Sequence, residues 1–300
     1  MSMYEEWHCS PEDAAIHPDV HVVGIPKAGT SFLYALLLSS PQLEPAARTK
    51  EYCPSKFLGE ASGSKERYFA GFSRGNSSKL SVNGCIATWD ALAIHNCVAP
   101  NLRAPRKYIL VFRRPDQWQW ARYNFWTNRL DSVQNTPGHW TPIGLSYRSP
   151  DLFHELVLAG DATVLKTFSD DAVGNWLRII REWRAVNFSS VLLLSNDDFK
   201  ADRLANTENK IAHFLHIKAQ FTLGSARVNS GASEHTRGAG NIASTQYAEG
   251  TYEVSGFRPM HYKTAVMIQE RNSVSCCAMR HDFQVDLFCC QEDNNSSTPR

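Results

Sequence analysis

Residues 20–40 read VHVVGIPKAGTSFLYALLLSS, and the expected architecture follows from this segment. Its first six residues, 20–25, form a short apolar run rich in β-branched side chains, which is typical of a buried strand. A turn with the sequence PKAGTS comes next, and residues 32–40 have the composition of a helix that ends before Pro41. The segment therefore predicts a strand, a tight turn and a helix in direct succession.

The same alternation continues along the chain. Residues 107–112 and 189–195 are further apolar runs typical of buried strands, and residues 170–186 form an amphipathic helical pattern. A further helix is predicted over 207–217, with Thr207 as its N-cap. Near-continuous apolar strands that alternate with helices predict an α/β fold, a P-loop-like parallel sheet flanked by helices on both faces.

Length and composition fit one such domain. The 300 residues are 43% hydrophobic and 20% charged, with a formal net charge of +1, which excludes a disordered chain and a broad basic surface for nucleic acid or membrane. We expect an irregular lead-in over 1–18, a single domain over 19–275, and a cysteine-containing segment with a disordered tail over 276–300. Residues 131–165, rich in proline, glycine and aromatics, are expected to form a long functional loop or lid.

No apolar run reaches the roughly 18 residues of a membrane span, and the first residues lack the pattern of a signal peptide. The chain as written is expected to be soluble and cytoplasmic, or to lie in the Golgi lumen if an N-terminal anchor precedes it. The eight cysteines form no CxxC pair, and no metal site is predicted. We expect buried or unreactive thiols, although the two adjacent pairs near the C-terminus could form disulfides.

The turn after the first strand has the features of an anion site. Unpaired N–H groups and the positive end of the helix dipole attract a phosphate, and Gly29 lets the backbone approach it. Thr30 and Ser31 add hydroxyl donors, and Lys27 adds a mobile cation. The order differs from a Walker A loop, in which the lysine directly precedes Ser or Thr. A strand–turn–helix with a surface lysine is the alternative interpretation.

The order PKAGTS resembles the 5′-phosphosulfate loop of sulfotransferases that use 3′-phosphoadenosine 5′-phosphosulfate (PAPS). The family also has a strand that ends in Arg-x-Pro, followed by a helix with a serine and an aromatic residue. Arg113, Pro115 and Tyr123 match this second motif, while Ala121 stands at the position of the serine. The resemblance implies that Arg113 and position 121 bind the 3′-phosphate, and that Ala121, which cannot donate a hydrogen bond, weakens cofactor binding.

A third similarity lies in TKEYCPSKF, residues 49–57. Carbohydrate sulfotransferases of the heparan sulfate type, which the chain resembles most, have a Lys-Glu pair here, and their glutamate is the proposed base. This implies that Glu51 is the general base, with Lys50 beside it. The family's glycine-rich basic loop implies Arg237 and Gly238 as further cofactor residues. The implied cofactor-binding residues are Pro26, Lys27, Ala28, Gly29, Thr30, Ser31, Arg113, Ala121, Arg237 and Gly238.

The resemblance implies transfer of a sulfuryl group from PAPS to a hydroxyl or amine, with Lys27 and Glu51 as catalytic residues and no metal. The acceptor is expected to be a carbohydrate, such as a glycosaminoglycan, or a small molecule. Two alternatives stay open: a catalytically impaired binding protein of the same fold, favoured by Ala121, and a P-loop nucleotide kinase or NTPase. The tryptophans are expected to lie mostly in the core. As an alternative, four near the expected cleft could stack on sugar rings: Trp118, Trp120, Trp126 and Trp140.

Overall fold

The structure is a computed structural model of the whole chain. It describes residues 8–47, 50, 52–53, 64–72, 78–86, 88–123, 150–159, 172–187, 190–223 and 260–290. Within these residues the elements are α1 (Pro11–Ile16), β1 (Val20–Val22), α2 (Thr30–Leu38), β2 (Leu43–Pro45), α3 (Ser64–Ala70), β3 (Leu80–Asn83), α4 (Thr88–Val98), η2 (Ala99–Asn101), β4 (Lys107–Phe112), α6 (Pro150–Ala159), α8 (Ala172–Asn187), β5 (Val191–Ser195), η4 (Asn196–Phe199), α9 (Ala201–Leu215) and α10 (Tyr262–Phe283). A further helical segment begins at Pro115 and is described as far as Tyr123.

The chain divides into two compact units. The first comprises Met1–Phe112 and Arg178–Val228, and the second comprises Arg113–Leu177 and Asn229–Arg300. All five described strands belong to the first unit, whereas the secondary-structure elements described in the second are helices. No described helix is long and apolar enough to cross a membrane.

The first unit is built on a five-stranded parallel sheet with the strand order β2-β3-β1-β4-β5. β1 lies in the middle, pairing with β3 on one side and β4 on the other. The side chains of β4 from Tyr108 onwards and all of β5 are buried, as expected for strands covered on both faces. Because the strands are parallel, their carboxyl ends share one edge of the sheet, which is where open α/β sheets bind ligands.

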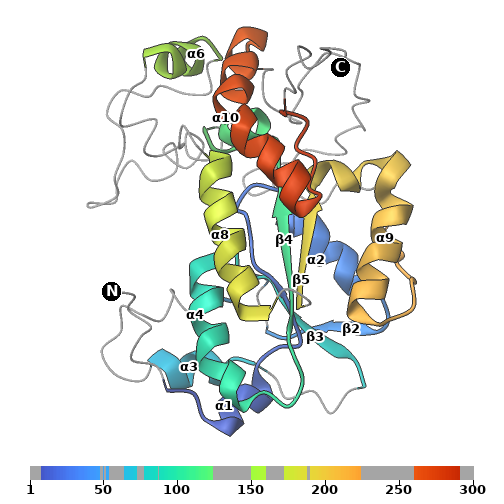
Figure 1. The fold of residues 1–300 in the computed structure, drawn as a ribbon. Coiled ribbons are helices and arrows are strands. Elements are labelled where there is room, and N and C mark those ends of the chain that lie inside the picture. The colour runs from blue at the N-terminus through green and yellow to red at the C-terminus, as the bar shows by residue number, and fades with distance from the viewer. Residues whose placement is uncertain are drawn as a thin grey trace, which may run out of the picture. The chain divides into compact units, whose positions relative to one another are not determined.

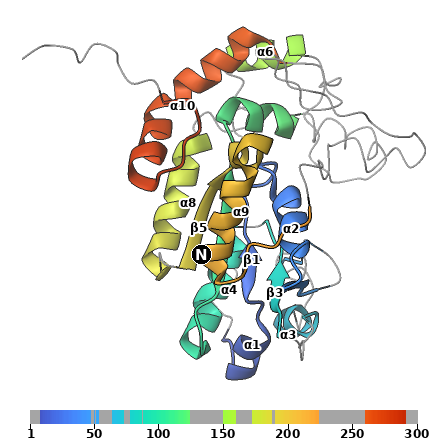
Figure 2. The same cartoon turned by 90° about the vertical axis from the view of Figure 1, so that its right-hand side faces the viewer.

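Helices cover both faces of this sheet. Figures 1 and 2 show α2 and α9 on one face, with α4 and α8 on the other. Successive side chains of β4 point to opposite faces of the sheet. The Lys107 ammonium lies 4.7 Å from the centre of the Phe214 ring on α9, while the centre of the Tyr108 ring lies 4.5 Å from that of the Trp183 ring on α8. The predicted α/β architecture is confirmed.

Some boundaries differ from the prediction. β1 ends at Val22 rather than at residue 25, and α9 begins at Ala201, so Thr207 is not an N-cap. Thr207 lies inside α9 and donates its hydroxyl to the Asp198 and Arg203 carbonyls. A short helix, α1, lies within the expected irregular lead-in. α6 occupies part of the segment expected to be a loop, because its apolar face packs in a core with α10.

The expectation of unreactive thiols is wrong. All eight cysteines are paired, and none is free. The first unit contains the disulfides Cys9–Cys97 and Cys53–Cys85. The second contains Cys276–Cys289 and Cys277–Cys290, which join α10 to the segment that follows it. Both C-terminal pairs have a sequence separation of 13, so two adjacent residues of α10 bond with two adjacent residues of the segment that follows it.

Candidate functional site

The loop between β1 and α2 lies at the carboxyl edge of the sheet. After β1 ends, the backbone continues to pair with β4, since the Ile25 N–H donates to the Val111 carbonyl over 2.9 Å. The Ala28 N–H then donates to the Ile25 carbonyl over 3.1 Å, which closes the turn. The loop is therefore fixed at its start by the strand next to it.

Three residues of this loop have positive φ, and Gly24 is the first of them. Lys27 has φ 67° and Gly29 has φ 102°, and Lys27 is in a region that lysine rarely adopts. A side chain at Gly29 would also collide with the amide of Asn196, which follows β5. That amide donates from Nδ2 to the Ala28 carbonyl over 3.0 Å. The glycine is thus required both by its backbone angle and by a close neighbour that holds the loop.

The first turn of α2 presents amide and hydroxyl groups to the loop. The Leu33 N–H donates to the carbonyl of the N-cap residue, Gly29, over 3.1 Å, and this is the first hydrogen bond of α2. The amides of Thr30 and Ser31 come earlier in the helix, where intrahelical acceptors are missing. The first unit therefore has the elements of an anion site: helix amides, the positive dipole end and two hydroxyls.

A second lysine reaches this turn from another part of the chain. Lys50 Nζ lies 2.7 Å from Ser31 Oγ and 3.5 Å from Thr30 Oγ1. Sequence reasoning named Lys50 only as the neighbour of Glu51 and gave it no role at the anion loop. Lys50 and Ser31 are 19 residues apart in the sequence, so no local sequence pattern indicates their contact. The two residues meet only in the folded chain.

The two arginines after β4 have different surroundings. Arg114 forms a two-point ion pair with Asp116, with Nη2–Oδ2 at 2.8 Å and Nε–Oδ1 at 3.2 Å, and Asp116 is fully buried. Arg113 is half-buried, and its Nε lies 3.4 Å from Gln117 Oε1. The two arginines thus have different side-chain neighbours, and the role of Arg113 at a ligand stays a prediction of the sequence motif.

The helical segment that follows has no hydroxyl at position 121. Ala121 is buried, and the neighbouring Arg122 lies with its guanidinium 4.7 Å from the centre of the Trp118 ring. Burial lowers the pKa of Arg122. Arg122 thus already has an aromatic partner inside its own unit.

Trp118 and Trp120 are core residues, as expected for most tryptophans, and the alternative of a sugar platform is wrong for these two. Trp118 is 4% exposed and packs edge-on against Trp176, while Trp120 is 1% exposed and packs in a core cluster with Tyr123 and Phe153. Their rings fill the interior of the second unit and offer no open face. Trp126 and Trp140 lie outside the described residues.

Several predicted site residues are not described by the structure. Glu51, Arg237 and Gly238 all lie outside the described residues. Within the part of the chain that is described, no group of three or more His, Cys, Asp and Glu is placed to hold a metal ion. The described half of the predicted site is therefore the loop from Pro26 to Ser31, together with Arg113 and Ala121.

Comparisons with known proteins give one kind of match. No family model matches the chain, and no curated protein sequence matches it. The chain is similar to the crystal structure of a sulfotransferase from Alicyclobacillus acidocaldarius, with a TM-score of 0.56 and 13% sequence identity, over 92% of this chain and 99% of that one. At this identity the likeness shows the fold: the parallel sheet flanked by helices is the sulfotransferase fold.

Proposed function

We propose that this protein is a sulfotransferase that uses PAPS as its donor. The observation that carries the proposal is the loop after β1, where two hydroxyls lie at a helix N-terminus with Lys50 Nζ 2.7 Å from Ser31 Oγ. Such a site suits a phosphate group, and it lies at the carboxyl edge of a sheet with the sulfotransferase fold. The similar structure is itself described as a sulfotransferase.

PAPS would bind through both of its phosphate-bearing ends. The amides and hydroxyls of Thr30 and Ser31 would bind the 5′-phosphate, and Lys27 would lie at the sulfuryl group. Arg113 would bind the 3′-phosphate, since it directly follows β4, the strand that pairs with β1. Arg237 and Gly238 would add contacts to the same phosphate.

The reaction would be an in-line displacement at sulfur. The acceptor oxygen or nitrogen forms a bond to sulfur while the bond from sulfur to the phosphate oxygen breaks, and 3′-phosphoadenosine 5′-phosphate leaves. Lys27 would stabilise the charge that develops on the leaving oxygen, and Glu51 would take the proton of the acceptor. Positioning and charge stabilisation supply the catalysis, as in phosphoryl transfer.

We further propose a carbohydrate hydroxyl, such as one of a glycosaminoglycan, as the acceptor, as in the heparan sulfate type that the Lys-Glu pair resembles. The four disulfides favour an oxidising compartment, because disulfides are rare where glutathione keeps thiols reduced. Of the two locations expected from the sequence, the Golgi lumen fits this observation and the cytoplasm does not.

The first test is calorimetry of the full chain with 3′-phosphoadenosine 5′-phosphate, with AMP as the comparison. We expect the 3′-phosphorylated nucleotide to bind more tightly, because Arg113 contacts the group that AMP lacks. Equal affinity for the two nucleotides, or no binding of either, would contradict the proposed donor.

The second test is transfer of radiolabelled sulfate from PAPS to a panel of carbohydrate acceptors by wild-type protein and Lys27→Ala. We expect the variant to lose about a hundredfold or more in turnover while it keeps its fold, because a charge-stabilising group is removed from the leaving oxygen. Lys65→Ala is the control, since Lys65 pairs with Asp13 rather than with the loop. Unchanged transfer by Lys27→Ala would remove Lys27 from the mechanism.

One observation favours a second candidate, a binding protein that no longer transfers sulfate. Ala121 stands where a donor to the 3′-phosphate is expected, and the neighbouring Arg122 stacks on Trp118. This candidate predicts nucleotide binding without transfer to any acceptor. The calorimetry and the transfer assay together separate it from the enzyme.

A further inference from the structure

The Lys50 ammonium contacts the hydroxyls of the anion loop directly. It lies 2.7 Å from Ser31 Oγ and 3.5 Å from Thr30 Oγ1, and an ammonium can only donate. Each hydroxyl that accepts from a cation keeps its own hydrogen for another acceptor. Lys50 thus turns the two hydroxyls toward donating to an anion and adds a positive charge close to them.

The end of β3 holds the backbone of this lysine. The Gly84 N–H donates to the Lys50 carbonyl over 3.0 Å, and Asn83 Nδ2 donates to the Tyr52 carbonyl over 3.0 Å. A Cβ at Gly84 would lie 2.8 Å from Lys50 Cγ and 2.9 Å from the Lys50 carbonyl oxygen. The glycine therefore permits the backbone at residue 84 to lie close to Lys50, whose side chain contacts the anion loop.

The disulfide Cys53–Cys85 completes this attachment. Cys85 directly follows Gly84, and Cys53 lies three positions after Lys50, so the covalent bond continues the two hydrogen bonds along the same pair of segments. Cys53 and Cys85 are both buried. Three consecutive residues at the carboxyl end of β3, from 83 to 85, thus bind the segment that contains Lys50.

We infer that Lys50 is a second positioning cation of the donor site, and that the Cys53–Cys85 disulfide keeps it there. Lys50 orients the Ser31 and Thr30 hydroxyls and partly offsets the charge of the 5′-phosphate that they bind. The inference rests on the proposed function, and it adds a redox requirement: full donor affinity needs the oxidised protein.

The test measures the affinity of the full chain for 3′-phosphoadenosine 5′-phosphate by calorimetry. We expect Lys50→Met to bind about tenfold or more weakly, the size expected for a hydrogen bond to a charged group. Lys50→Arg keeps the charge and should recover part of the affinity. Lys50→Met should also show a weaker dependence of affinity on salt than wild type, a change that loss of structure alone would not produce.

The disulfide is tested by a double-variant comparison. Cys53→Ala/Cys85→Ala should lower the affinity several-fold, and the same change in the Lys50→Met background should lower it no further, because both act through one ammonium. Gly84→Ala, which leaves the disulfide cysteines in place, should behave in the same way and serves if the disulfide variant does not fold. Cys9→Ala/Cys97→Ala, which removes a disulfide at another place, should bind like wild type.

The outcomes separate this inference from the proposed function. If wild-type protein does not bind the nucleotide, the proposed function fails. If wild type binds and Lys50→Met binds equally well, only the role of Lys50 fails. Losses that simply add in the combined variants would overturn the link between the disulfide and the lysine, and a loss of affinity in Cys9→Ala/Cys97→Ala would show that the disulfide effect is not local.

Discussion

The two edges of the parallel sheet differ in what their polar side chains do. At the carboxyl edge, Lys50, Ser31 and Thr30 form contacts between polar groups that can also bind a phosphate. At the amino edge, His17 and His21 stack at 4.3 Å, His21 stacks on Tyr108 at 5.2 Å, and all three side chains are buried. The carboxyl edge places the Lys50 ammonium at a helix end, whereas these three rings near the amino edge are buried.

The burial and the partners of these histidines explain why their rings stay neutral. His21 Nε2 lies 3.0 Å from the Pro18 carbonyl, which only accepts, so that nitrogen carries the hydrogen. His95 Nδ1 lies 2.6 Å from the Tyr108 hydroxyl. Burial lowers the pKa of His21 to about 3 and that of His95 to about 4. The comparison indicates that the buried rings near the amino edge contribute stability, while the proposed binding site lies at the carboxyl edge.

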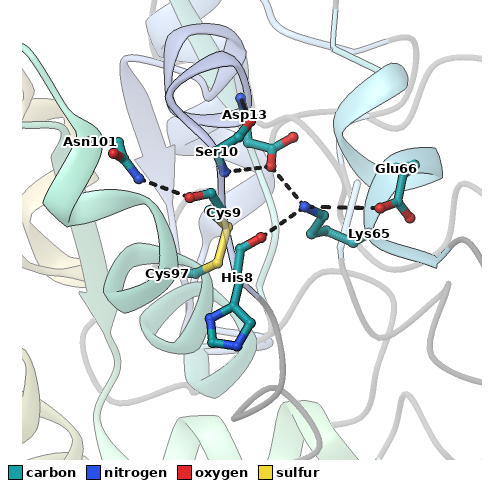
Figure 3. Close-up of a disulfide and its surroundings, with 8 residues drawn as sticks. All are labelled: His8, Cys9, Ser10, Asp13, Lys65, Glu66, Cys97 and Asn101. Carbon is teal, nitrogen blue, oxygen red and sulfur yellow. Dashed lines mark hydrogen bonds and ion pairs between the residues drawn. A yellow bond between two sulfur atoms is a disulfide. The ribbon is translucent and has the colours of Figure 1, made fainter.

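The largest expected effect is the loss of stability on removal of the disulfide Cys9–Cys97, which lies on the side of the amino edge. Cys9–Cys97 joins residues 88 apart, in a network where Lys65 donates to the His8 carbonyl and pairs with Asp13 (Figure 3). Cys9→Ser/Cys97→Ser should lower the free energy of unfolding by about 4 kcal/mol, because the open chain gains entropy when unfolded. Urea unfolding measures this change.

The same variant should keep the nucleotide affinity of wild type at temperatures where it is folded. A large loss of stability with unchanged affinity would sharpen the difference between the edges. A variant as stable as wild type would show that the hydrogen bonds around Cys9 already fix the N-terminal segment without the disulfide.

The next prediction concerns acid, with the effect taken for each buried histidine separately. Below about pH 6.5 the unfolded chain protonates its histidines, while the buried imidazoles, whose pKa values are lowered, stay neutral, so stability falls as the pH falls. Each such imidazole should cost about 2 kcal/mol between pH 7 and pH 5. The loss ends only near the folded pKa values. Urea unfolding at several pH values measures the slope.

His21→Phe is the matched variant for this prediction, since it keeps a ring between His17 and Tyr108 but cannot bind a proton. Its free energy of unfolding should change less steeply with pH than that of wild type between pH 5 and 6.5. Identical slopes would show that His21 takes no part in the acid response.

The sequence predicts the architecture well because its signals are local. The predicted strands at 107–112 and 189–195 and the glycine turn at residue 29 are each determined by neighbouring residues. The errors have long-range causes. Thr207 has a good capping side chain, but α9 continues back to Ala201, and the disulfides join cysteines that only the folded chain brings together.

In the candidate site, too, local features can be predicted from the sequence and long-range contacts cannot. The strand–turn–helix around Pro26 to Ser31 can be predicted because its residues are contiguous, and the place of Arg113 directly after a strand can be predicted from the apolar run before it; the binding roles of these residues stay predictions. Lys50 and Asn196 were missed as loop neighbours, since each comes from a different part of the fold. One signal for Asn196 was available: polar residues directly after an apolar strand lie at the carboxyl edge of a parallel sheet.

The smallest expected effect concerns that asparagine. Asn196 Nδ2 donates to the Ala28 carbonyl over 3.0 Å and lies against Gly29, so it supports the anion loop from the end of β5. Asn196→Ala should weaken binding of 3′-phosphoadenosine 5′-phosphate by about fivefold, the equivalent of one neutral hydrogen bond of about 1 kcal/mol. Calorimetry of the variant beside wild type measures the change.

Asn101→Ala is the matched control at the other edge. Asn101 Nδ2 likewise donates to a loop carbonyl, that of Cys9, over 2.8 Å (Figure 3). The substitution removes a neutral hydrogen bond of the same kind, so it should lower the free energy of unfolding by about 1 kcal/mol. It should leave the affinity for the nucleotide unchanged. If both variants lost affinity equally, the loop would be responding to general loosening of the unit, and the carboxyl edge would not be the separate binding surface that the comparison requires.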